Sequence, residues 1–298
     1  MPQESPKLPP RRRRRSAVTR ANAWWRHAVA LITCIFALFP LLYAVSSSLS
    51  ASGSLMSSNQ LFSTISLINY QDLFSNPHTP FLRWFMNSMV IAISTAIGTT
   101  VIGAAAAYAF SRFRFAGRRK ALMSLLVIQM FPQLLAFVAI FLLLFAISQV
   151  YPALGLNSWM GLIAVYLGGA LGANTFLMYG FFNTIPRDID EAATIDGASH
   201  AQIYWTMILP LVRPILVVVG MLSFITAFSD FLLARIVLQD PHQYTLAVGL
   251  YEFVSVQFGE DWGVFSAGAV ISALPVVLLF LLLQRYIVAG LTGGAVKG

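Results

Sequence analysis

The residues of this chain that could do chemistry are concentrated in one short segment between two apolar runs. Residues 191–210 read EAATIDGASHAQIYWTMILP and combine two carboxylates, Glu191 and Asp196, with alanines and a glycine. Small side chains let a backbone settle into a groove on another protein, and carboxylates fix its register against a basic surface. The pattern favours docking to a partner; a solvated loop that only caps the rest of the protein is the alternative.

Motifs for common kinds of catalysis are absent from the sequence. It has no G-x-x-x-x-G-K-[ST] phosphate-binding loop, no H-E-x-x-H and no G-x-S-x-G. The four histidines lie in different segments without metal-ligand spacing: His27, His78, His200 and His242. We therefore expect no catalytic residue, cofactor or metal site, and any energy that the protein uses has to come from a partner.

Composition places the chain in a membrane. Of its 298 residues, 58% are hydrophobic and 10% are charged, whereas soluble domains carry roughly a quarter charged residues. The mean hydropathy is +0.74. A net charge of +8 would suggest nucleic acid as the partner of a soluble protein, but membrane proteins retain basic residues on the cytoplasmic side. No nucleic-acid partner is expected, and the single Cys34 excludes an intrachain disulfide.

Six stretches are long and apolar enough to cross a hydrocarbon core, which takes roughly 20 residues of helix. The turn-forming run 151–158 separates the third stretch from the fourth. The expected spans are residues 28–45, 86–110, 121–147, 160–182, 211–229 and 262–284.

Basic residues orient these spans. With the N-terminus inside, 17 of the 19 Lys and Arg side chains are cytoplasmic, and only Arg83 and Arg235 fall outside. The chain then divides into a basic cytoplasmic tail that touches anionic lipid, 1–27, a membrane domain, 28–290, and a flexible cytoplasmic tail, 291–298. The other interpretation of the start is a cleaved secretory signal, which leaves the orientation of the last five spans unchanged.

Groups at membrane depth allow more than one interpretation. The mid-span prolines Pro40, Pro132 and Pro275 indicate either ordinary kinks in a bundle or hinges for alternating access. Asp230, just beyond the outer end of the fifth span, is the only candidate for an ion-coupling group, and its place favours an interfacial residue; Arg213 is expected to snorkel. An ion-driven carrier needs such a group near the midplane, so this class is disfavoured.

Neutral polar side chains within the spans are Gln129, Gln133 and Asn174. They either form hydrogen bonds between helices or line a passage for hydroxyl-rich solutes.

Local signals predict two short helices in the loop 186–210. Pro186 suits the first turn of a helix, and the acidic residues that follow complement its positive end. Gly197 can end this helix in the left-handed conformation. Ser199 and Gln202 match a capping box that begins the second helix, and Pro210 is expected to start the fifth span.

This loop resembles the EAA loop of binding-protein-dependent ABC importer permeases, which engages a separate ATPase. The likeness implies an all-α polytopic membrane protein with six transmembrane helices, N-in and C-in, arranged as a type I ABC importer permease bundle with a cytoplasmic coupling-helix loop. The residues implied to contact the ATPase are Glu191, Ala192, Ala193, Asp196, Gly197, Ala198, Leu209 and Pro210.

Within this family the chain looks closest to the G subunit of maltose and maltodextrin importers, over roughly residues 28–298. The segments that carry the likeness are AYAFSRFRF at 107–115, QMFP at 129–132 and YTLAVGL at 244–250. By resemblance, the C-terminal residues that reach the ATPase are Gly293, Gly294, Val296 and Lys297. The residues implied to contact a binding protein are Val256, Gln257 and Phe258.

The resemblance implies a non-catalytic permease subunit of an ATP-driven importer of maltose-like sugars in the bacterial inner membrane. The implied partners are a homologous F-type permease subunit, a dimer of ABC ATPases, a periplasmic solute-binding protein, the sugar and membrane lipid. In maltose importers the membrane sugar site belongs mainly to the F subunit, so by resemblance this chain lines the path. The alternative is a self-contained secondary sugar carrier, which would work without ATP.

Overall fold

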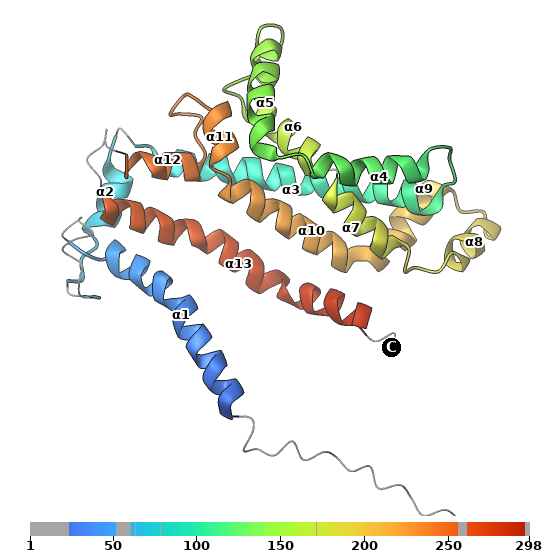
Figure 1. Ribbon diagram of the computed structural model, residues 1–298, viewed down its shortest axis with the longest axis horizontal. Coiled ribbons are helices and arrows are strands. Elements are labelled where there is room, and N and C mark those ends of the chain that lie inside the picture. Colours follow the sequence, from blue (N-terminus) through green and yellow to red (C-terminus); the bar gives the residue numbers. More distant parts are fainter. Residues whose placement is uncertain are drawn as a thin grey trace, which may run out of the picture.

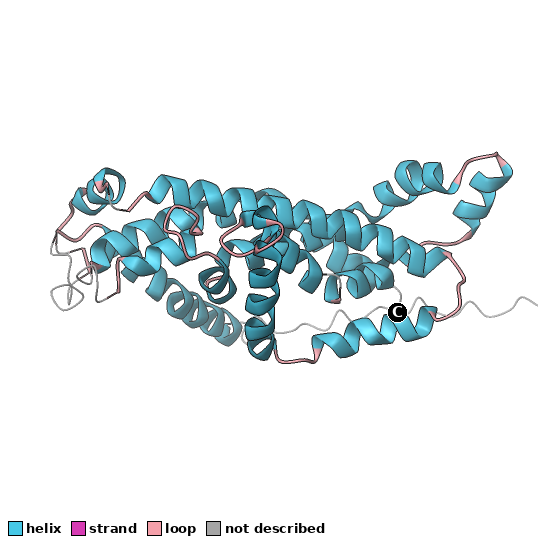
Figure 2. Cartoon of the chain, turned by 90° about the horizontal axis from the view of Figure 1, so that it is seen from above, coloured by secondary structure: helices cyan, strands magenta, loops and turns pink. Residues whose placement is uncertain are grey.

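The computed structural model of the protein describes residues 24–51, 61–62, 64–77, 79–170, 172–255 and 261–295. Within these ranges every regular element is a helix (Figures 1 and 2). The expected all-α class is confirmed.

Four described helices are long and apolar enough to cross a membrane: α1 (Trp24–Ser48), α3 (Phe81–Arg112), the run His200–Ser229, and α13 (Trp262–Ala295) from its start to Tyr286. Two bent pairs bring the number of spans to as many as six. They are α4 (Arg118–Gln129) with α5 (Gln133–Ser148), and α6 (Trp159–Ala170) with α7 (Ala173–Phe182).

The expected span 121–147 is not one continuous helix, because α4 and α5 meet at 98°. Pro132 lies between them with an extended backbone (φ −61°, ψ 115°). Proline lacks the N–H that would continue the helix, and it disfavours helical geometry in the residue before it. As a result, α5 projects out of the layer that the other long helices form (Figure 1).

The fifth span also differs from the expectation that Pro210 starts it. One helical run passes through α9 (His200–Gln202), a π-helical turn, η3 (Ile203–Ile208), and α10 (Leu209–Ser229). Pro210 cannot donate an N–H to the carbonyl of Thr206, four residues back. A π turn, whose N–H groups reach five residues back, occupies the residues just before it.

The helices enclose two buried clusters, and α3 contributes to both. One cluster lies toward the end of the bundle that carries α2 (Ile68–Ser75) and α12 (Leu246–Glu252), and it includes Trp84 and Leu162. The other lies toward the opposite end and includes Tyr108, Phe182 and Val212. Because α10 packs along α3 (Figure 1), these two helices form the frame on which the ends of the bundle are built.

The end that carries α12 is held to α3 by side-chain bonds to backbone. Trp84 Nε1 donates to the carbonyl of Pro241 (2.8 Å), and Asn87 Nδ2 donates to the carbonyl of Tyr244 (2.9 Å). Ser88 Oγ accepts from the N–H of Leu246 (2.7 Å). Two short elements complete this end, α11 (Leu232–Val237) and the 3₁₀ turn η2 (Pro152–Leu154).

Candidate docking site at the loop end of the bundle

The loop 186–210 projects from one end of the bundle as α8 (Asp188–Ile195) followed by α9 (Figure 1). The helix α8 begins two residues after Pro186, with Arg187 as its N-cap, so the expectation that Pro186 forms its first turn is wrong. The acidic first turn is present: Asp188, Asp190 and Glu191 complement the positive end of the helix dipole.

The turn between α8 and α9 has the expected geometry. Gly197 adopts φ +85°. Its N–H donates to the carbonyl of Thr194 (3.0 Å), and the N–H of Ala198 donates to the carbonyl of Ala193 (3.0 Å). These two bonds define a Schellman motif, which satisfies carbonyls that the helix end leaves free.

The predicted capping box at the start of α9 is confirmed. The backbone N–H of Ser199 donates to Gln202 Oε1 (2.8 Å), and the N–H of Gln202 donates to Ser199 Oγ (3.3 Å).

The helix α8 has one buried face and one exposed face. Ala193 is 3% exposed and belongs to the buried cluster of this end. Glu191, Ala192 and Gly197 are exposed, and so is Ile195, at 87%. Ile195 was not among the residues predicted from the sequence. Its residue type alone does not single it out, because α8 also contains Ile189, which is half-buried. An apolar side chain so exposed is typical of a surface that a partner covers.

An ion pair fixes α8 to the end of α3. Arg112 Nε lies 3.0 Å from Asp190 Oδ2, and the side chains are only 7% and 18% exposed. Arg112 Nη2 donates to the carbonyl of Ile185 (3.3 Å), and Arg187 Nη2 donates to the carbonyl of Ser111 (2.8 Å). One of these bonds is donated by α3 to the loop and the other by the loop to α3. We therefore expect α8 to move together with α3.

Aromatic rings fix the start of the second helix. The ring of Tyr108 lies 4.9 Å from that of Tyr204 and 5.7 Å from that of Phe113, measured between centroids. The Phe113 ring meets the His200 imidazole edge to face at 5.4 Å. The segment 107–115 thus packs against the loop 186–210.

Of the other predicted site residues, Asp196 is the exposed C-cap of α8. Ala198 and Leu209 are half-buried, and Pro210 is exposed. Gly293 and Gly294 belong to α13. Five predicted site residues lie outside the described part of the chain: Val256, Gln257, Phe258, Val296 and Lys297.

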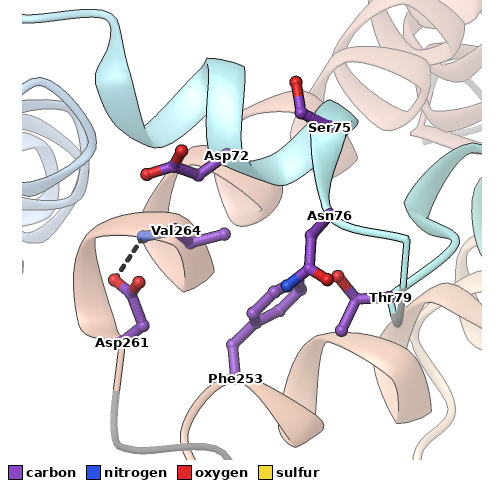
Figure 3. A pocket seen from close by; sticks show the side chains of 7 residues that line it. All are labelled: Asp72, Ser75, Asn76, Thr79, Phe253, Asp261 and Val264. Carbon is purple, nitrogen blue, oxygen red and sulfur yellow. Dashed lines mark hydrogen bonds between the residues drawn. The ribbon is translucent and has the colours of Figure 1, made fainter.

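A small pocket of about 360 Å³ lies at the opposite end of the molecule, between α2 and the start of α13 (Figure 3). Its lining residues are Asp72, Ser75, Asn76, Thr79, Phe253, Asp261 and Val264. Asp261 accepts the N–H of Val264 (3.2 Å), which makes it a helix cap. Among the described residues there is no group of three or more His, Cys, Asp or Glu side chains that could hold a metal ion.

A bundle of long apolar helices with a short acidic helix presented at one end defines a class: a multi-span membrane protein with an exposed acidic loop. Residues 99–293 match the family described as "Binding-protein-dependent transport system inner membrane component", so the chain belongs to this family. The family expected from the loop 186–210 is therefore confirmed, and the protein is a component of a transport system.

Relatives with similar sequences agree with this assignment, and a solved structure shares the fold. The maltodextrin transport system permease MdxG of Bacillus subtilis is 39% identical over 264 residues, covering 89% of this chain and 92% of that protein. The galactooligosaccharides permease GanQ of the same organism is 38% identical over 265 residues, with the same coverage. A bacterial ABC transporter that imports alginate has a similar fold, with a TM-score of 0.76, 23% identity and coverage of 90% and 98%.

Proposed function

We propose that this chain is the G-type permease subunit of an ATP-driven importer of maltose-like di- and oligosaccharides, spanning the bacterial inner membrane several times. The observation that carries the substrate class is the 39% identity to a maltodextrin permease over 92% of that protein's length. Such a subunit forms half of the translocation path and catalyses no reaction itself.

The loop 186–210 is the contact with the ATPase. Its exposed face carries the small residues Ala192 and Gly197, the apolar side chain of Ile195 and the carboxylate of Glu191. These groups can enter a groove on the ATPase. A basic rim on the ATPase would fix the carboxylate, and an apolar floor would bury the isoleucine. The absence of a phosphate-binding loop from the sequence supports a separate ATPase.

The remaining partners are a homologous F-type permease subunit, a second copy of the ATPase and a periplasmic solute-binding protein. The helix α1 supports the need for a membrane partner or lipid, because its most apolar stretch has no buried residue. In this arrangement the F-type subunit holds most of the sugar site, and this chain lines the path.

The test is the ATPase activity of the assembled transporter in liposomes, with maltose, maltotriose, trehalose and a galactose-containing disaccharide offered through the binding protein. We expect maltose-type sugars to stimulate ATP hydrolysis and to accumulate inside. Stimulation by the galactose-containing sugar alone would refute the substrate class and leave the family intact.

A further inference from the structure

A basic groove of about 940 Å³ opens between α4 and α7, at the same end of the bundle as α8. The linker from α3 to α4 and the first turns of α4 form one wall, and Tyr179 of α7 forms the other. The lining residues are Phe115, Gly117, Arg118, Arg119, Lys120, Leu122, Met123 and Tyr179.

Three cations face this groove without an acidic partner. Arg118 is held in place by Tyr179: its Nη2 donates to the tyrosine oxygen (3.0 Å), and its guanidinium carbon lies 5.7 Å from the ring centroid. Arg119 and Lys120 are exposed. Among the described residues the ion pairs are Arg112–Asp190 and Arg235–Glu252, so none of the three cations is neutralised.

The arrangement carries an electrostatic cost. The three cations are the first three residues of α4, whose first turn contains no acidic side chain. Positive charge is disfavoured at the start of a helix, where the helix dipole is itself positive. An anion in the groove would offset this effect.

The groove continues into an apolar surface. Leu122 and Met123 also line the groove, and Met123 is 53% exposed. Further along α4, the exposed apolar side chains are Val127 at 64% and Ile128 at 68%, beside exposed Ser124 and Gln129. A soluble anion would use only the basic mouth. A molecule with an anionic head and a hydrocarbon tail would match both parts.

We propose that this groove binds one anionic phospholipid. The phosphate accepts hydrogen bonds from Arg118 and Arg119 and pairs with Lys120, and an acyl chain lies along Met123 and Val127. Guanidinium groups bind phosphate oxygens in pairs, and basic pockets on the cytoplasmic side of membrane proteins suit such head groups. The site depends on the membrane location of the chain and not on which sugar is transported.

Native mass spectrometry of the assembled transporter, titrated with phosphatidylglycerol in detergent, tests the site. The variant is Arg119→Gln/Lys120→Gln, which leaves the Arg118–Tyr179 contact in place. The control is Arg114→Gln/Arg213→Gln, which removes the same charge from exposed positions outside the groove. We expect the variant to bind one phosphatidylglycerol at least about tenfold more weakly and the control to match the parent. Exchange of the two groove residues, Arg119→Lys/Lys120→Arg, should preserve binding.

Several results would overturn the proposal. Equal losses in the variant and the control would mean general attraction of charge, and an unchanged variant would mean that the groove binds no lipid. Displacement of phosphatidylglycerol by millimolar inorganic phosphate or glycerol phosphate would identify a site for a free anion. Loss of the ATPase from the variant complex, with lipid retained, would assign the cations to a protein contact.

Discussion

Arg112 connects the membrane bundle to the exposed helix through one ion pair and one hydrogen bond to backbone. Breaking a buried pair by removing one partner costs more than the pair contributes, because it leaves an uncompensated charge. Asp190 keeps 18% of its side chain exposed, so water reduces this penalty.

We expect Arg112→Ala to loosen α8 by about 2 kcal/mol. Hydrogen exchange of the α8 amides in the assembled transporter should then accelerate roughly 30-fold, and less sugar should be moved for each ATP hydrolysed. The matched control is Asp188→Asn, which neutralises an exposed carboxylate in the same turn. Arg112→Ala/Asp190→Ala should cost less than the sum of the two single changes; strict additivity would mean that the pair does not couple α8 to α3.

Substitutions of Gly197 can distinguish the effect of backbone strain from the effect of lost docking. Its φ is +85°, and a Cβ placed there would meet no atom within 4 Å. The same holds for Gly117, which also has φ +85° and open space around it. Alanine at either position should therefore cost only the left-handed strain, about 1 kcal/mol.

Tryptophan at the same two glycines should give different results. Gly197→Trp places a bulky group on the proposed contact surface, so we expect the ATPase to be lost when the complex is purified in detergent. Gly117→Trp is the matched control and should retain the ATPase. If both variants kept it, Gly197 would not face the ATPase.

At the scale of elements, α12 packs on α3 so closely that only glycine fits at the contact. A Cβ on Gly249 would lie 2.1 Å from the ring of Trp84, and that ring is 1% exposed and hydrogen-bonded through its nitrogen. The ring cannot move aside without breaking this bond.

Gly249→Ala should therefore lower the stability of the purified complex by about 1–3 kcal/mol, because overpacking forces side chains or backbone to shift. A lower midpoint of thermal unfolding in detergent would be the sign. Gly180 of α7 is the control, since nothing lies within 4 Å of its Cβ position. Gly180→Ala should leave the midpoint unchanged or raise it, because alanine favours helix. A midpoint that stays unchanged for Gly249→Ala would show that the packing can relax.

At the scale of the whole molecule, the surface is apolar where a soluble protein would be polar. The helix α1 shows its apolar residues throughout, with Phe36 81% exposed and Ile32 67% exposed. The sequence places no carboxylate in the interior of α1, α3, α5 or α13, so these helices offer no acidic group to couple proton or cation movement to transport.

The chain alone in liposomes should not accumulate sugar down a proton or sodium gradient. The assembled transporter should accumulate sugar when ATP is supplied, without an ion gradient. Accumulation should stop when ATP is replaced by a non-hydrolysable analogue. Uptake by the isolated chain would support the self-contained carrier instead.

Features that depend on neighbouring residues could be predicted from the sequence. The length of the apolar runs predicted spans, because bilayer thickness sets the number of helical residues. Gly197 predicted the left-handed turn, and Ser199 with Gln202 predicted the capping box, because such geometry depends on side chains within one helical turn. The loop 186–210, which carries the family likeness, could be recognised from the sequence because its motif residues are close together in the chain.

Features that depend on residues distant in sequence appear only in the folded chain. It pairs Arg112 with Asp190, seats Trp84 against Gly249 and divides the face of α8 between buried Ala193 and exposed Ile195. Pro132 was visible as a helix breaker, but the 98° turn between α4 and α5 was not. A proline removes a hydrogen bond, while the direction that the chain takes next is set by the packing of the helices around it.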